Sequence, residues 1–229
     1  MTHERRNSST RRTRHGAKPQ HPPHGSGARG AEQMRQRICV EAARIMAEEG
    51  VKDFHAAKRK AANRLNQPET RHLPSNQEIE AALAAHLQLF HSDHLPNALK
   101  ELRATALEAM RFLATFEPRL VGSVLSGNVT PYSEIQLHLS ADTPEEVAFL
   151  LQEHGIPYDE SSRRMRFGGE RYEVQPTYHF LADATAVELT VFTPEGAREA
   201  PLSPVDGKPM RRANLREIET LLTNANEQA

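Results

Sequence analysis

The stretch from residue 122 to 137 reads Gly-Ser-Val-Leu-Ser-Gly-Asn-Val-Thr-Pro-Tyr-Ser-Glu-Ile-Gln-Leu and contains the residues best suited to chemistry. Its opening Gly-Ser pair permits close approach of the backbone to a ligand and supplies a hydroxyl group. Toward its end, polar and apolar residues alternate, which predicts a half-buried strand. Glu134, Gln136 and His138 then lie on one face of that strand. The stretch therefore predicts a row of polar groups close to a glycine turn.

This stretch resembles the signature of the nucleotidyltransferase superfamily, the group that includes polymerase-beta-like and antibiotic-adenylylating enzymes. In that family, a Gly-Ser pair at the end of a strand precedes a second strand that bears two acids one residue apart. A third acid comes from a later strand. Gly122 and Ser123 match the pair, Glu134 and Gln136 take the two acidic positions, and Glu188 is the candidate for the third.

The resemblance implies a site that binds a nucleoside triphosphate with magnesium and transfers a nucleotidyl group to a hydroxyl or phosphate acceptor. Side chains at i and i+2 on a strand share a face, so Glu134 and Gln136 would bind metal together with Glu188. The metal would hold the phosphates, and Glu188 would also be the catalytic base. Gly122 and Ser123 would bind the phosphates through backbone amides and the hydroxyl.

Three residues depart from the family pattern. Gln136 is neutral, Ser126 stands where many members carry Arg, and Glu134 is one methylene longer than the usual Asp. Loss of one acid from a two-metal site weakens the electrostatic stabilisation on which transfer depends. The sequence thus leaves open whether the protein is an enzyme. The alternative is a catalytically inactive scaffold with the same fold.

Basic residues outside this stretch suggest contacts with phosphate. Lys208 and Arg211 flank an Asp-Gly turn after the last expected strand and are predicted to bind phosphate. In residues 1–30, Glu4 is the single acid and there are seven basic residues: Arg5, Arg6, Arg11, Arg12, Arg14, Lys18 and Arg29. Such a tail is consistent with salt-sensitive contact with RNA or DNA, with contact with anionic lipid or the acidic body of the protein, and with a solubilising extension. A nucleic-acid-docking protein is therefore a further interpretation.

The pattern of apolar residues predicts an α+β fold in three parts. Hydrophobic residues make up 38% of the chain and aromatic residues 5%, and residues 1–32 hold almost no apolar side chains, which predicts a disordered basic tail. Helical periodicity then predicts a helical region over residues 33–116. Residues 117–226 are expected to form a nucleotidyltransferase-like domain, a small mixed β-sheet with flanking helices.

The expected strands span residues 119–125, 134–139, 163–167, 171–178 and 186–192, with helices at 143–155 and 215–222. The family assignment requires Val121, Ile135 and Leu189 to lie in one sheet, with the helix from Thr143 packed on a face of it.

Composition limits the compartment and the kinds of partner. No apolar run is long enough to span a bilayer, and the N-terminus lacks the apolar stretch of a signal peptide, so we expect no membrane contact and a cytoplasmic location. Cys39 is the single cysteine, which excludes an internal disulfide and a zinc site made of cysteines. The sequence does not indicate an oligomeric state.

Overall fold

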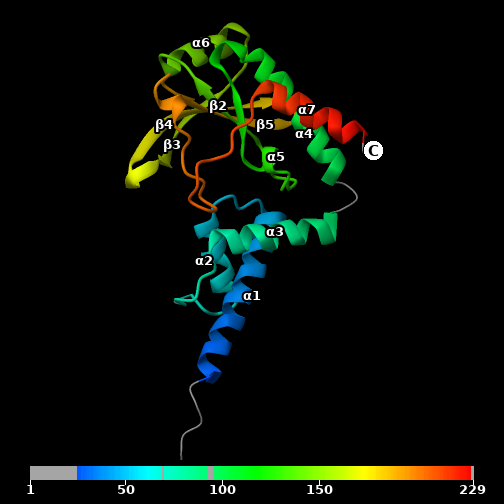
Figure 1. Cartoon of the computed structure of the whole chain (residues 1–229), viewed down its shortest axis with the longest axis vertical. Coiled ribbons are helices and arrows are strands. Elements are labelled where there is room, and N and C mark those ends of the chain that lie inside the picture. The colour runs from blue at the N-terminus through cyan, green and yellow to red at the C-terminus, as the bar shows by residue number, and fades with distance from the viewer. Residues whose placement is uncertain (1–24, 69, 92–94, 228–229) are drawn as a thin grey trace, which may run out of the picture.

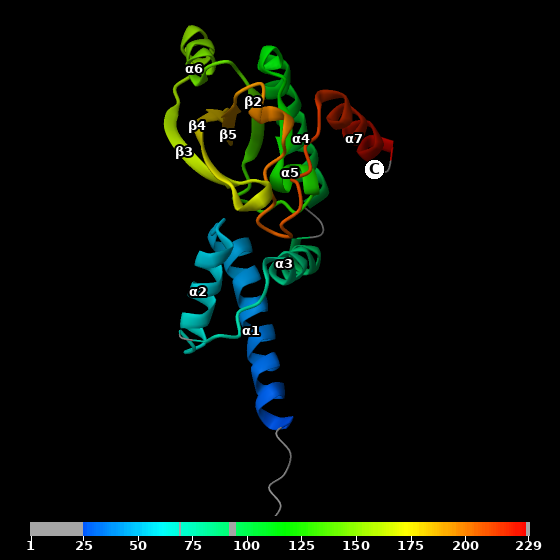
Figure 2. The same ribbon diagram turned by 60° about the vertical axis from the view of Figure 1, so that its left-hand side comes forward.

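The computed structural model describes residues 25–68, 70–91 and 95–227, and these residues form an α+β fold (Figure 1). We divide it into a helical module, residues 25–91, and a sheet module, residues 95–227. The helical module lies below the sheet module in both ribbon views, and the loop of residues 193–214 reaches from the sheet toward it (Figures 1 and 2). The expected α+β class, with a helical N-terminal region and a mixed sheet, is confirmed.

The helical module consists of α1 (Gly25–Glu49), α2 (Phe54–Arg64) and α3 (Asn76–His91). Asp53 caps α2 by accepting a hydrogen bond of 2.7 Å from the Ala56 amide. A capping box begins α3: the Ser75 amide donates to the Glu78 carboxylate at 2.7 Å, and the Glu78 amide donates to the Ser75 hydroxyl at 3.2 Å. These local signals fix where both helices begin.

Residues 1–32 were predicted to be disordered, and this prediction is wrong for residues 25–32. Residues 25–32 belong to α1, because extending a helix that is already anchored by packing adds one hydrogen bond for each residue fixed. This outweighs the low helix propensity of its glycines. Residues 1–24 lie outside the described residues, as does their predicted contact with nucleic acid.

The sheet module contains four helices, α4 (Leu95–Phe112), α5 (Gly122–Ser126), α6 (Pro144–Glu153) and α7 (Leu215–Glu227). Short 3-10 turns occupy Ala114–Phe116, Gly168–Glu170 and Gly196–Arg198. Its strands are β1 (Arg119–Val121), β2 (Ile135–Ser140), β3 (Asp159–Arg166), β4 (Tyr172–Ala182) and β5 (Thr185–Phe192).

The strands form one mixed sheet in the order β1-β2-β5-β4-β3. Only β2 and β5 pair in parallel, whereas the other neighbours are antiparallel. Val121, Ile135 and Leu189 thus lie on three neighbouring strands, and α6 buries Val147 and Leu151 against the sheet. The predicted arrangement of these strands and of the helix is confirmed.

The first expected strand is much shorter than predicted. Residues 119–125 were expected to form a strand running into a glycine turn, but β1 ends at Val121 and the next five residues form α5. Gly122 has a φ of +73°, a left-handed conformation that ends the strand and that other residues rarely adopt. β3 and β4 are longer than expected, because their exposed residues lack a clear alternation of polar and apolar types.

The hydrophobic cores place α4 with the sheet, whereas the expected boundary between residues 116 and 117 places it with the helical region. Met110 and Leu113, in and just after α4, are fully buried in the cluster of the sheet and not in that of α1–α3. Figure 2 shows α4 beside the sheet and apart from the helical module. The division into domains stays a prediction. In the described part of the chain, no helix is both long and apolar enough to cross a lipid bilayer.

Candidate functional site

A pocket of about 850 Å³ lies where the helical module meets the sheet module. The turn between α1 and α2 and the start of α3 form one wall. The opposite wall comes from α5, the loop that follows it, the end of β3, and residues 201–211. The site is therefore built from segments that are far apart in the sequence.

Tyr132 joins the two walls. Its hydroxyl donates a hydrogen bond of 3.0 Å to the backbone carbonyl of Glu48 at the end of α1. Gly50 has a φ of +68°, and a Cβ at this position would lie 2.8 Å from the Tyr132 ring. A glycine is thus required on both conformational and steric grounds for the ring to pack against the turn.

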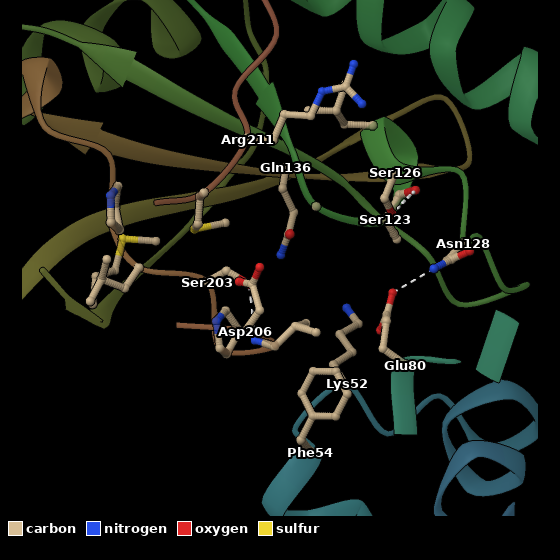
Figure 3. Close-up of a pocket in the computed structure, with 18 of the residues that line it drawn as sticks. Lys52, Phe54, Glu80, Ser123, Ser126, Asn128, Gln136, Ser203, Asp206 and Arg211 are labelled. Carbon is tan, nitrogen blue, oxygen red and sulfur yellow. Dashed lines mark hydrogen bonds between the residues drawn. The ribbon is translucent and has the colours of Figure 1, made fainter. Parts of the chain in front are cut away.

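Two side-chain amides make further contacts between the modules. Asn128 donates to the Glu80 carboxylate at 2.7 Å, as Figure 3 shows, and Asn76 donates to the Pro204 carbonyl at 2.6 Å. Both contacts hold loops of the sheet module against α3. They fix the width of the pocket.

The residues predicted from sequence gather around this pocket. Six of them line it: Gly122, Ser123, Glu134, Gln136, Lys208 and Arg211. The seventh, Glu188, is buried beneath and is hydrogen-bonded to Gln136. The sequence pattern thus identified side chains that the fold brings together, although their roles are not thereby tested.

Gly122 and Ser123 lie where β1 gives way to α5. A Cβ on Gly122 would lie 2.3 Å from Oε1 of Gln136, so the Gln136 side chain rests directly against this glycine. The Ser123 hydroxyl donates to the Ser133 hydroxyl at 3.3 Å, and Ser133 also accepts from the Thr130 amide at 2.9 Å. These bonds tie α5 to the loop that leads into β2.

Gln136 and Glu188 are directly opposite each other on the parallel strands β2 and β5. The Gln136 amide nitrogen donates to Oε1 of Glu188 at 3.3 Å, and Nη1 of Arg163 donates to the same oxygen at 2.5 Å. Glu188 is only 8% exposed, and its charge is balanced by Arg163, whose side chain is 41% exposed. The carboxylate expected to be the catalytic base is held in an ion pair.

Glu134 is also paired with a cation, since its carboxylate contacts the ammonium group of Lys52 from the helical module. The Glu134 side chain is 13% exposed and that of Lys52 is 58% exposed, so the ammonium group reaches this carboxylate from the solvent side. Figure 3 shows Lys52 and Gln136 pointing into the pocket from opposite walls.

The donors around Gln136 do not fit a two-magnesium site. Magnesium prefers oxygen ligands in octahedral geometry, but the Gln136 amide presents nitrogen to Glu188, and Arg163 and Lys52 contact the two carboxylates. Among the described residues, no three His, Cys, Asp or Glu side chains come close enough together to hold a metal ion. Magnesium binding therefore stays a prediction.

Lys208 and Arg211 belong to a short loop with a rigid turn. The Lys208 amide donates to the Asp206 carboxylate at 3.1 Å, and this hydrogen bond holds the pKa of Asp206 below its usual value. The Lys208 carbonyl accepts from the Ser203 amide at 2.7 Å. Within the described part of the chain, neither Lys208 nor Arg211 has an ion-pair partner, so both cations are free to meet an anion.

Sequence reasoning missed the basic residues contributed by β3 and by the helical module. Arg163, Arg164 and Arg166 line the pocket together with Lys52. Arg164 stacks on the Tyr172 ring, 4.2 Å from its centroid. Three arginines in four residues could have been recognised as a cluster. Lys52 could not, because nothing local indicates which carboxylate it reaches.

His138 shares the strand face of Gln136 but is not part of the pocket lining. It is 4% exposed, and its ring lies 4.8 Å from that of Phe192. Burial, with smaller effects from Arg212 and Arg163, lowers the pKa of His138 to about 3. Its Nδ1 atom has no hydrogen-bond partner among the residues that the structure describes. The histidine is thus a neutral core residue.

Comparison with known proteins identifies no relative: no protein-family model matches the chain, and no curated protein matches it significantly.

Proposed function

We propose that the protein binds a nucleotide in the pocket between its two modules, in the manner of the nucleotidyltransferase superfamily that residues 118–192 resemble. One observation carries the proposal. Gly122 and Ser123 line the same pocket as Lys208 and Arg211, although the two pairs are far apart in the sequence. Phosphate groups are the ligands that glycine turns and clustered cations both suit.

The charge of the pocket favours an anion. Its lining includes the cations Lys52, Arg163, Arg164, Arg166, Lys208 and Arg211 and the acids Glu80, Glu134 and Asp206. Since Lys52 and Arg163 are each paired with a carboxylate, four cations remain to attract phosphate. An excess of one sign in a cleft concentrates oppositely charged ligands.

The other wall of the pocket supplies an apolar surface. Met46, Val51, Phe54 and Leu83 of the helical module line it. A base can pack on such side chains, while the phosphates lie against the sheet module. The pocket therefore offers both environments that a nucleotide requires.

Binding rather than transfer is the chemistry that these residues support. A neutral amide at Gln136 does not repel a phosphate, whereas a carboxylate there would need a metal ion between them. Arg163 and Lys52 already balance the nearby acids. We therefore expect a nucleotide to bind without magnesium.

The test is calorimetric titration with ATP, GTP, CTP and UTP, with and without magnesium. Native protein should bind at least one of them in either condition. Lys208→Gln combined with Arg211→Gln should weaken binding by at least about tenfold, about 1.4 kcal/mol, since each charged hydrogen bond lost costs that much or more. Arg216→Gln is the matched control, because Arg216 is exposed on α7 and does not line the pocket.

Gln136→Asp tests the role of the amide. The substitution should weaken binding without magnesium and make the remaining binding depend on the metal. Rapid turnover of nucleotide by the native protein in magnesium would show instead that it is a transferase. Failure of all four nucleotides to bind would favour the scaffold interpretation, and binding of RNA or DNA alone would favour the nucleic-acid interpretation.

A further inference from the structure

The two edges of the sheet differ in how far they are covered. At one edge, the β1 residue Leu120 exchanges backbone hydrogen bonds of 2.8 and 2.9 Å with Ala213. At the other edge, among the described residues, β3 has a single backbone hydrogen bond of this kind, from the Leu202 amide to the Arg166 carbonyl at 2.6 Å. Figure 2 shows β3 as the outermost strand of the sheet, with no ribbon beyond it. An edge of this kind is a template for another strand.

The direction of the free backbone groups on β3 follows from that contact. The Arg166 carbonyl points away from β4, so the alternate residues Glu160, Ser162 and Arg164 also direct their amides and carbonyls outward. In the described part of the chain, these outward groups have no backbone partner. All three residues are exposed.

The charged side chains on this edge are complementary between two antiparallel copies of β3. When two copies of β3 run antiparallel about a two-fold axis through Ser162, Glu160 of each copy lies opposite Arg164 of the other. Opposite charges in direct register stabilise a strand pair. Because Glu160 and Arg164 are four residues apart, about 13 Å along the strand, they do not satisfy each other within one copy.

Both charges are available for such a contact. Among the described residues, Glu160 has no ion-pair partner, and Arg164 contacts only the Tyr172 ring. In the register centred on Arg163, Glu160 would lie opposite Arg166, whose carbonyl already accepts a hydrogen bond from the Leu202 amide. The register centred on Ser162 instead uses outward backbone groups that are free in the described part of the chain.

We propose that the protein forms a two-fold symmetric dimer through β3, in which the Glu160–Arg164 pair is made twice and the two sheets become one. Three hydrogen-bonded residue pairs then contribute about six backbone hydrogen bonds. The dimer does not rest on the proposed nucleotide binding, but the two share Arg164, so in the dimer Arg166, Lys208 and Arg211 remain, among the described residues, as the unpaired cations of the pocket.

Sedimentation equilibrium over a range of protein concentrations tests the proposal. The mass of the native protein should rise with concentration from 25.7 kDa toward twice that value. Glu160→Arg and Arg164→Glu should each raise the dissociation constant by at least about tenfold, because each sets like charges opposite one another at two positions. The double substitution should restore the native dissociation constant, since it only exchanges the partners.

The matched control is Glu101→Arg, an exposed charge reversal on α4, which should leave the dimer unchanged. Circular dichroism confirms that each variant is folded. If a charge-reversal variant is unfolded, Glu160→Gln or Arg164→Gln takes its place. A native protein that stays monomeric at every concentration overturns the proposal. So does a dimer that the single substitutions leave intact, or one that the double substitution fails to restore.

Discussion

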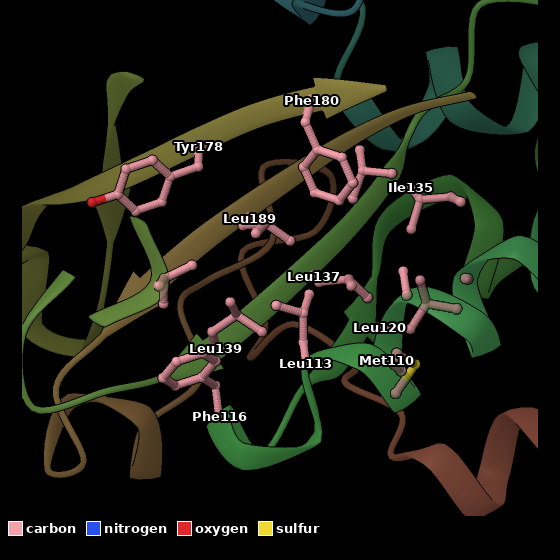
Figure 4. Packing of buried hydrophobic residues seen from close by; sticks show 14 of the residues in the cluster. Met110, Leu113, Phe116, Leu120, Ile135, Leu137, Leu139, Tyr178, Phe180 and Leu189 are labelled. Atoms are coloured by element: carbon pink, nitrogen blue, oxygen red, sulfur yellow. The ribbon is translucent and has the colours of Figure 1, made fainter. Parts of the chain in front are cut away.

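Alanine makes up a larger share of the helical module's core than of the sheet module's core, where large side chains predominate. The buried residues of α1 and α2 include six alanines: Ala42, Ala43, Ala47, Ala57, Ala61 and Ala62. Figure 4 shows the sheet core, where Leu113, Leu137 and Phe180 interdigitate between α4 and the strands. Alanines let helices approach closely, but each buries little apolar surface. Removing buried side-chain atoms should therefore destabilise the sheet module most, whereas adding them should destabilise the helical module.

Charged groups also differ between the modules. The helical module holds its acids at the surface, where Arg64 and Lys60 pair with Glu49, and exposed pairs of this kind contribute little to stability. The sheet module instead buries the Glu188 carboxylate, which half-exposed Arg163 contacts, and the neutral ring of His138. Because burial lowers the pKa of His138, acid should affect the sheet module at a higher pH.

The largest effect is expected from a cavity in the sheet core. Leu137 on β2 is fully buried, so Leu137→Ala should lower the free energy of unfolding by about 3 kcal/mol. Urea denaturation followed by circular dichroism measures the loss. Leu181→Ala is the control, because Leu181 is 67% exposed on β4 and its removal should cost less than about 0.5 kcal/mol. A loss below about 1 kcal/mol for Leu137→Ala would contradict a tightly packed core.

The helical module should respond to the opposite change. Ala61 is fully buried on α2, and Ala61→Leu should cost about 2 kcal/mol because the added atoms force α1 and α2 apart. Ala56→Leu, on the exposed side of the same helix, supplies the control. Thermal denaturation measures both variants. Should Ala61→Leu stabilise the protein, the helices would have room between them and the contrast between the cores would be lost.

The sequence predicted the parts of this molecule that depend on local patterns. The capping box at Ser75 and the strand predicted from the alternation at 134–139 are short-range features, and the structure contains both. Burial along β2 does not alternate as expected, because His138 is buried between Leu137 and Leu139. The packing of α4 with the sheet was missed, because an apolar stripe on a helix does not indicate which core it joins. Likewise, β3 was shortened because its exposed residues at 159–162 have no buried face to reveal it.

The candidate site shows the same limit. Five of the predicted residues, Gly122, Ser123, Glu134, Gln136 and Glu188, could be found because the resemblance gives their spacing. Lys208 and Arg211 were predicted from their charge beside an Asp-Gly turn. The partners of Glu134 and Glu188 could not, since Lys52 lies in the other module and Arg163 on another strand. Ion pairs across the fold depend on tertiary placement, and these pairs decide whether the acids are free to bind a metal.

Lowering the pH should reduce the free energy of unfolding by about as much as Ala61→Leu does. His138 has a pKa of about 3 in the folded protein, below its unfolded value of 6.5. The folded state thus binds fewer protons, so this contribution to stability is complete above pH 6.5 and is lost as the pH falls toward 3. Between pH 7 and pH 5 the loss should be about 2 kcal/mol. Glu49 and Glu78, with pKa values of about 2, should begin to lose their contribution only below pH 4.5.

His138→Phe isolates this contribution, because phenylalanine fills the site without titrating. Urea denaturation at pH 7, 6 and 5 should show a shallower decline for the variant than for the native protein. Equal slopes in the two proteins would mean that His138 can be protonated without disrupting the fold.

The smallest effect on global stability is expected at the junction of the modules. Lys52 pairs with Glu134 across the pocket, but its side chain is 58% exposed, so Lys52→Ala should cost less than about 1 kcal/mol. Lys60→Ala is the matched control, since Lys60 pairs with Glu49 at 2.6 Å inside the helical module and is exposed to a similar extent. The two variants should have similar unfolding free energies and differ in local dynamics.

Hydrogen exchange should become faster in residues 128–134 only for Lys52→Ala, because this loop carries the other half of the contact. Added salt should have the same local effect on the native protein, since it screens exposed pairs. Exchange in this loop that neither Lys52→Ala nor added salt changes would mean that Tyr132 and the Asn128 and Asn76 amide contacts hold the modules together. Lys52 would then serve only to balance the charge of Glu134.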